Sequence, residues 1–190
     1  MRKNSYFLAT QIARFGALSI PQMKLACGDR CKQATIYRML DDLIDQGLVK
    51  RIVFGKEAKF RFAATPNLYY MINGEDFKRI TGVKEFSSLH TEAVADVLLT
   101  LSRYDFVTGI VTELEVEPAH LQHFCYNRTP DAVIEINNGT LQAYLAIEVE
   151  KSRKSNERIS EVLNKYKLTF QENMPCGGLM VVTDTETLRD

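Results

Sequence analysis

The chain has 190 residues, of which 45% are hydrophobic and 25% are charged, values that are ordinary for globular proteins with a hydrophobic core. It contains no run of about 18 apolar residues and no signal peptide at its start, which argues against a membrane partner and predicts a cytoplasmic protein. The net charge is zero, but the charges are unevenly distributed along the chain. Residues 1–63 contain 12 Lys and Arg and 5 Asp and Glu, whereas residues 64–190 contain 12 Lys and Arg and 19 Asp and Glu.

Helical periodicity dominates the basic front of the chain. Apolar spacing predicts a first helix over Ser5–Phe15, and Ser19-Ile20-Pro21 begins a short second helix. A third helix follows Asp29 and ends at Gly47. We expect one apolar stripe of the third helix to face inward, formed by Ala34, Tyr37, Leu40, Leu43 and Ile44.

Two short strands follow, Val49–Phe54 and Lys59–Ala63, around a turn at Gly55-Lys56-Glu57. Three helices and a basic hairpin are the order of a winged helix-turn-helix, whose third helix enters the major groove and whose hairpin touches the DNA backbone. Winged helices also serve as protein-docking modules, but the positive charge favours double-stranded DNA as the partner. The candidate DNA-binding residues are Arg30, Lys32, Gln33, Thr35, Arg38, Lys56, Lys59 and Arg61.

The cysteines and most of the histidines carry weaker signals. The four cysteines are scattered without the spacing of a secreted disulfide framework, so we expect reduced thiols, with Cys27 and Cys31 as packing residues. His120 and His123 hint at a transition-metal site, but no second cluster accompanies them.

Turn signals between residues 64 and 86 mark the expected domain boundary. We expect a DNA-binding domain at 1–72, a linker at 73–86 and a second domain at 87–190, truncated at its C-terminus. In the second domain we expect a helix, three strands, an amphipathic helix and a buried strand, in that order. Their expected ranges are Ser87–Tyr104 for the first helix, Phe106–Glu117, Asp131–Ile136 and Leu141–Glu150 for the three strands, Ser155–Gln171 for the amphipathic helix and Gly178–Thr183 for the buried strand. The whole chain is therefore expected to be an α+β protein.

Acidic side chains stand out on two of these strands. Asp131 begins one strand, Glu148 and Glu150 share a face of the next, and Asn137-Asn138-Gly139 is a strong hairpin turn signal between them. Carboxylates on apolar strands are costly to bury unless something pairs with them, and a divalent cation is a common partner. The sequence therefore predicts that three carboxylates converge on Mg²⁺ (or Mn²⁺) for phosphodiester cleavage.

With this order and motif, residues 87–184 resemble the PD-(D/E)XK nuclease superfamily, which implies a restriction-endonuclease-like core of order αβββαβ. One departure is that Val149, not an acid, stands two residues before Lys151. The segment Glu148-Val149-Glu150 instead resembles the variant in which a second carboxylate takes the lysine position. Lys151 then faces away from the metal unless a bulge re-aims it.

The whole chain resembles the replication-relaxation family, which includes the MobC-type plasmid mobilisation relaxases. The matching pieces are His90 on the first helix of the second domain, Glu113 on its first strand, Pro130-Asp131 and Glu148-Val149-Glu150, with Lys165-Tyr166 as a weaker match. The resemblance implies a DNA-nicking relaxase or endonuclease at a plasmid origin of transfer or replication, acting with other relaxosome proteins.

Roles follow for the candidate catalytic residues. In this reading Asp131 and Glu148 hold the metal, and Glu150 is a further ligand or the base that orients water. Glu113 and Glu92 are candidate outer metal ligands, Lys151 is a candidate to contact the scissile phosphate, and His90 is a further candidate catalytic residue.

Several alternatives stay open. The carboxylates are simply solvated if the second domain is an inactive nuclease-like copy, and the protein is then a DNA-binding regulator or relaxosome accessory protein. A three-histidine relaxase site is improbable, because the chain has 3 histidines in all. The sequence leaves open whether nicking is hydrolytic or proceeds through a covalent tyrosine link, and which of the 8 tyrosines would serve.

Overall fold

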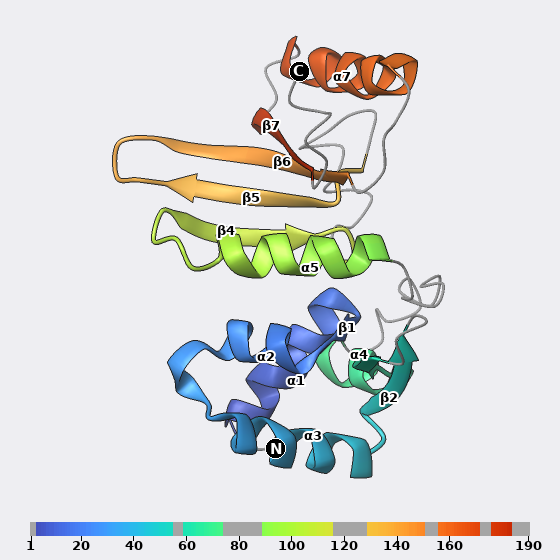
Figure 1. Cartoon of the computed structure of the whole chain (residues 1–190). Helices are drawn as coiled ribbons and strands as arrows, with labels where there is room; N and C mark the ends of the chain where they lie inside the picture. Colours follow the sequence, from blue (N-terminus) through green and yellow to red (C-terminus); the bar gives the residue numbers. More distant parts are fainter. Residues whose placement is uncertain are drawn as a thin grey trace. The chain divides into compact units, whose positions relative to one another are not determined.

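A computed structural model describes residues 3–54, 59–73, 89–115, 129–150, 156–171 and 176–183 (Figure 1). It is a mixed α+β structure with two separate sheets. The chain divides into two compact units, Met1–Ala95 and Asp96–Asp190. This division falls inside helix α5 (Leu89–Leu101), further along the chain than the linker expected at 73–86, most of which lies outside the described residues.

The first unit begins with the expected order of three helices and a hairpin. Its elements are α1 (Lys3–Phe15), β1 (Ala17–Leu18), α2 (Ile20–Cys27), a 3-10 turn (Gly28–Arg30), α3 (Gln33–Asp45), β2 (Val49–Phe54), β3 (Lys59–Ala64) and α4 (Pro66–Asn73). The strands form an antiparallel sheet in the order β1-β3-β2. The two-residue strand β1 was not foreseen from the sequence.

Local chemistry sets the limits of α2 and α3. Ser19 caps α2: its hydroxyl accepts from the Gln22 backbone N–H at 3.3 Å, and the Gln22 side chain accepts from the Ser19 N–H at 2.9 Å. Pro21, in the first turn of α2, supplies a backbone already set for a helix. Past the end of α3, Gly47 adopts a φ of 66°, which favours glycine, and its N–H bonds to the Ile44 carbonyl.

The buried face of α3 corrects the stripe expected from the sequence. The buried residues are Ile36, Met39, Leu40 and Leu43, whereas Ala34 is exposed and Tyr37 is 45% exposed. Leu40 and Leu43 belong to both stripes, so the helix is rotated by part of a turn from the expected orientation. Tyr37 therefore joins the polar outer face.

Cys27 and Cys31 are buried, free thiols at the junction of α2 and α3, as packing residues should be. Burial, together with the neighbouring Cys31 thiol, raises the pKa of Cys27 to about 12. The pair thus behaves as part of the core of the first unit.

We expect iodoacetamide to alkylate Cys27 far more slowly in the native protein than in urea. At about pH 8 a thiol with a pKa three units above normal has roughly 10³-fold less thiolate, the reactive form. Peptide mass spectrometry of a labelling time course measures this ratio. Equal rates for Cys27 in the native and urea-unfolded chains would contradict the burial described.

The described elements of the second unit follow the order α-β-β-β-α-β that the sequence predicts. From Asp96 it holds the rest of α5, then β4 (Val107–Thr112), β5 (Ala132–Asn137), β6 (Gln142–Glu150), α7 (Asn156–Gln171) and β7 (Cys176–Thr183). The sheet order is β4-β5-β6-β7, antiparallel except for the parallel pair β6 and β7 (Figure 1).

The β5–β6 hairpin confirms the predicted turn. Gly139 adopts a φ of 85°, and the Asn137 and Asn138 side-chain oxygens accept backbone N–H groups of the loop. The helix α7 makes the crossover between the parallel strands, and its Tyr166 packs with Ala146 of β6 in a buried cluster. Among the helices that the structure describes, none is long and apolar enough to cross a lipid bilayer.

Candidate functional site

Three acidic residues lie in one row at the same end of three neighbouring strands: Glu113 directly follows β4, Asp131 directly precedes β5 and Glu148 lies on β6. The ladder pairs Ala132 with Ile147, so the next step places Asp131 opposite Glu148. On the other side, the Glu113 N–H donates to the Asp131 carbonyl at 3.1 Å. The backbone positions of Glu113, Asp131 and Glu148 therefore follow one another across the sheet, where β5 begins and β6 approaches its end.

Asp131 is tied to β6 through its side chain. Its Oδ2 accepts a hydrogen bond of 2.7 Å from the backbone N–H of Val149. A carboxylate that accepts from a backbone N–H is held in place by a charge-assisted bond, stronger than a neutral one. This bond fixes Asp131 beside Glu148, the residue that precedes Val149.

Glu148 is the most enclosed of the predicted acidic residues. It is 6% exposed, and its Oε1 accepts a hydrogen bond of 2.6 Å from the hydroxyl of Tyr166 on α7. Tyr166 is itself buried against Ala146, which shares the Glu148 face of β6. Since a buried carboxylate is costly unless it is hydrogen-bonded, Tyr166 acts as a positioning residue for Glu148.

We expect Tyr166→Phe to lower the free energy of unfolding of the second unit by about 1.5–3 kcal/mol. The change removes the hydroxyl that donates to the buried Glu148 carboxylate while keeping the packed ring. Urea unfolding followed by circular dichroism measures the loss. The control is Tyr104→Phe, which alters an exposed tyrosine of the same unit and should change stability by less than about 0.5 kcal/mol.

The remaining predicted catalytic residues are Glu150, His90 and Lys151. Glu150 lies two residues along the same face of β6, partly buried and opposite Thr183. His90, on the first turn of α5, belongs to the first unit. Lys151, His120 and His123 lie outside the described residues.

The described residues contain no group of three or more His, Cys, Asp or Glu that could hold a metal ion. The predicted convergence of Asp131, Glu148 and Glu150 is therefore not found in this part of the chain. The pair Asp131 and Glu148 still fits one class of ion, because Mg²⁺ keeps several waters and commonly binds through one or two carboxylates plus substrate phosphates. Mn²⁺ prefers the same oxygen ligands.

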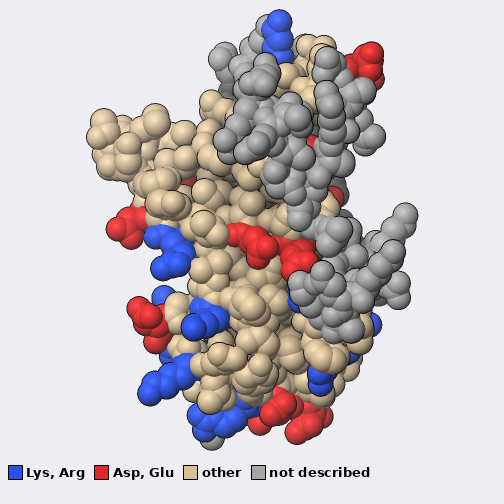
Figure 2. Space-filling model, viewed as in Figure 1, with Lys and Arg blue, Asp and Glu red and all other residues tan. Residues whose placement is uncertain are grey.

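Most of the predicted DNA-binding residues lie at the start of α3 or just before it. Arg30, Lys32, Gln33 and Arg38 are exposed, and Thr35 is partly buried, accepting from the Arg38 guanidinium at 3.4 Å. The exposed carboxylates Asp41, Asp42 and Asp45 occupy the second half of the helix. Figure 2 shows this division along the lower edge of the first unit, with blue side chains at one end and red at the other.

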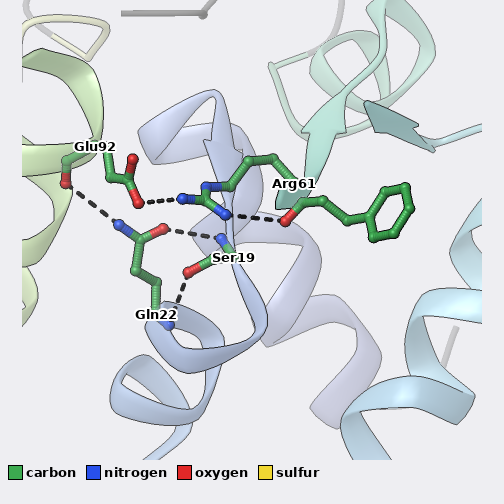
Figure 3. Close-up of polar contacts among 5 residues, drawn as sticks. Ser19, Gln22, Arg61 and Glu92 are labelled. Carbon is green, nitrogen blue, oxygen red and sulfur yellow. Dashed lines mark hydrogen bonds and ion pairs between the residues drawn. The ribbon is translucent and has the colours of Figure 1, made fainter. Parts of the chain in front are cut away.

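Arg61 corrects the expected role of the hairpin. Its side chain is 9% exposed, forms an ion pair with Glu92 and donates to the Phe60 carbonyl at 3.0 Å (Figure 3). The Gln22 amide of the α2 cap also donates to the Glu92 carbonyl at 3.3 Å. Arg61 and Glu92 thus join β3 to α5 within the first unit, and the Arg61 guanidinium is not on the exposed surface where a DNA contact was expected.

Two further side chains outside the predicted DNA-binding set are exposed in the first unit. Arg51 is exposed, and its guanidinium lies over the Phe60 ring, 3.3 Å from the centroid. Tyr37 is the second, on the outer face of α3, and it is 45% exposed. Because side chains alternate along paired strands, the sequence could have predicted that Arg51 and Arg61 lie on opposite faces of the hairpin. Lys56 lies outside the described residues, as does the Lys59 side chain.

Comparison with protein-family models, with curated proteins and with solved structures gives no match to this chain. The resemblance to replication-relaxation proteins and PD-(D/E)XK nucleases therefore stays a hypothesis carried by the residues themselves.

Proposed function

We propose that the chain binds duplex DNA through its first unit and nicks one strand with the help of a divalent cation held by its second unit. The observation that carries the proposal is the pair of carboxylates, Asp131 and Glu148, fixed side by side at one end of two strands. The proposed folds are a winged helix-turn-helix and a restriction-endonuclease-like core.

In the proposed complex, the first half of α3 faces DNA. Lys32 and Arg38 contact phosphates, while Gln33 and Tyr37 are placed to meet base edges in the major groove. The carboxylates in the second half of α3 repel the backbone and so limit the contact to the first two turns. The N-terminal end of α3 adds the partial positive charge of the helix dipole.

In the second unit, Asp131 and Glu148 would hold Mg²⁺ or Mn²⁺ next to a DNA phosphate. The cation supplies stabilisation of charge on the phosphate and a lowered pKa for a bound water. Tyr166 keeps the Glu148 carboxylate oriented, and the Val149 N–H does the same for Asp131. Glu150, on the same face, is the candidate to orient the attacking water. The resemblance places the reaction at a plasmid origin of transfer or replication.

Incubation of the full chain with supercoiled plasmid bearing a cognate origin tests the proposal. We expect conversion to the open circular form with Mg²⁺ and none with EDTA, because carboxylates repel a phosphodiester unless a divalent cation lies between them. If the chain binds DNA but does not nick it, the nicking proposal is wrong and a second candidate function, DNA binding alone, is supported.

That second candidate is a DNA-binding regulator or relaxosome accessory protein with an inactive nuclease-like unit. It is favoured by one observation: in the described residues, protein donors engage both carboxylates and no group of three ligands forms. It predicts salt-dependent DNA binding without any Mg²⁺-dependent cut.

A further inference from the structure

A cavity lies between the first turn of α1 and one side of α3. Its volume is about 640 Å³, which is within the usual range for sites that bind small molecules. Ser5 and Met39 are buried residues of its lining. The exposed charged side chains that line it are Lys3, Arg38, Asp41 and Asp42. We name this feature the α1–α3 cavity.

Ser5 brings an unused polar group to the cavity. It is 5% exposed, and no described residue forms a hydrogen bond with its hydroxyl. A buried hydroxyl is costly unless something hydrogen-bonds it. Ser5 also belongs to the first turn of a 13-residue helix that has no acidic side chain in that turn. The partial positive charge at this helix end favours an anion, which could accept from the Ser5 hydroxyl.

The α3 side of the cavity carries opposite charges one helical turn apart. Arg38 precedes Asp42 by four residues, which is about one turn of the helix. Within the described part of the chain, neither side chain forms an ion pair. The Arg38 guanidinium donates to the Thr35 hydroxyl at 3.4 Å, which leaves other N–H groups for a ligand. The cavity thus offers cationic donors on one turn of α3 and carboxylate acceptors on the next.

We propose that the α1–α3 cavity binds a ribose phosphate, free or as part of a nucleotide, and that this ligand releases DNA from the first unit. The phosphate contacts the Arg38 guanidinium, the Ser5 hydroxyl and the start of α1. The sugar hydroxyls donate to Asp41 and Asp42, as ribose does to carboxylates in dinucleotide sites. A phosphate ion alone gains nothing from these carboxylates, which repel it.

The release of DNA follows from the shared use of Arg38, so this part of the inference rests on the proposed DNA binding. The Arg38 guanidinium is also proposed to contact a DNA phosphate, and the two anions then compete for it. By linkage, each ligand weakens the binding of the other by the same factor. Ser5 is buried and has no part in the proposed DNA contact, so it separates the two roles.

Isothermal titration calorimetry of the full chain tests the site with three probes: ribose 5-phosphate, adenosine monophosphate and inorganic phosphate. We expect at least one of the first two to bind about tenfold more tightly than inorganic phosphate, because the sugar hydroxyls add hydrogen bonds to carboxylates. Similar affinities for the two organic probes identify the sugar phosphate as the recognised part. Tighter binding of adenosine monophosphate identifies a nucleotide.

Matched variants assign the affinity to the cavity. We expect Ser5→Ala and Arg38→Ala to weaken binding of ribose 5-phosphate about tenfold, and Asp42→Asn to reduce its advantage over inorganic phosphate. The controls are Lys24→Ala, which removes an exposed cation of α2 outside the lining, and Asp45→Asn, which does the same for an exposed carboxylate of α3. Both controls should bind the probe within about twofold of the parent.

Fluorescence anisotropy with a labelled duplex measures the release of DNA. Ribose 5-phosphate at about ten times its dissociation constant should weaken duplex binding by the parent about tenfold, the factor for mutually exclusive binding. Without the probe, Ser5→Ala should bind the duplex as the parent does. At the same probe concentration its duplex affinity should fall only about twofold, because its affinity for the probe is lower.

The contradicting outcomes differ for the two parts of the inference. No binding of any probe, or equal losses in Arg38→Ala and Lys24→Ala, would overturn the cavity as a ligand site and leave the proposed DNA binding untouched. Probe binding without any change in duplex affinity would overturn the competition. A chain that binds the probe but no duplex would contradict the proposed DNA binding, and the release of DNA with it.

Discussion

Asp131→Asn is expected to reduce Mg²⁺-dependent nicking by at least about 100-fold, which corresponds to roughly 2.7 kcal/mol of transition-state stabilisation. Asparagine keeps a side-chain oxygen that can accept the Val149 N–H, so the local structure should survive. It removes the negative charge that would hold the cation. Agarose gel assays of supercoiled plasmid measure the rate.

The matched control for this variant is Glu135→Gln. Glu135 lies on β5, on the same face as Asp131 but at the hairpin end, where it accepts from Gln142. The change removes one carboxylate charge from the same strand and should leave nicking within about twofold of the parent. Nicking by Asp131→Asn at the parental rate would show that Asp131 has a structural role only.

Glu92→Ala is expected to lower the free energy of unfolding of the first unit by about 3 kcal/mol. The Arg61 side chain is 9% exposed, and removal of its partner leaves a buried guanidinium charge without compensation. Urea unfolding of the full chain, followed by circular dichroism, measures the change.

A double-mutant cycle separates the ion pair from other effects. Arg61→Met keeps most of the apolar stem and removes the charge, so we expect a smaller loss than for Glu92→Ala. Once Arg61 is Met, adding Glu92→Ala should change stability little further. Additive losses in the double variant would contradict the ion pair that joins β3 to α5.

The sequence predicts the β5–β6 hairpin of the second sheet well because its signals are local. Apolar runs indicated β5 and β6, and the Asn-Gly turn predicted their pairing, so the adjacency of Asp131 and Glu148 follows from the residues alone. The hydrogen bonds from Tyr166 and the Val149 N–H could not be predicted in this way. They depend on how α7 packs on the sheet and on the backbone just beyond the strand.

The errors in the first unit have a different physical origin. Two apolar stripes of α3 share Leu40 and Leu43. One stripe is completed by Ile36 and Met39 and the other by Ala34 and Tyr37, and helical periodicity alone does not show which of them is buried. Arg61 looked like a DNA contact because basic hairpin residues usually face solvent. Its partner Glu92 is 31 positions away, so only the tertiary structure reveals the pair.

The central claim is that Asp131 and Glu148 form a divalent-cation site, and Mn²⁺ binding tests it most directly. The electron paramagnetic resonance signal of free Mn²⁺ can be followed while Mn²⁺ is titrated into the full chain with saturating duplex DNA. The account predicts Mn²⁺ uptake by the parent that is lost in Asp131→Asn and retained in Glu135→Gln. Uptake that is the same in all three proteins, or absent from the parent, would contradict it.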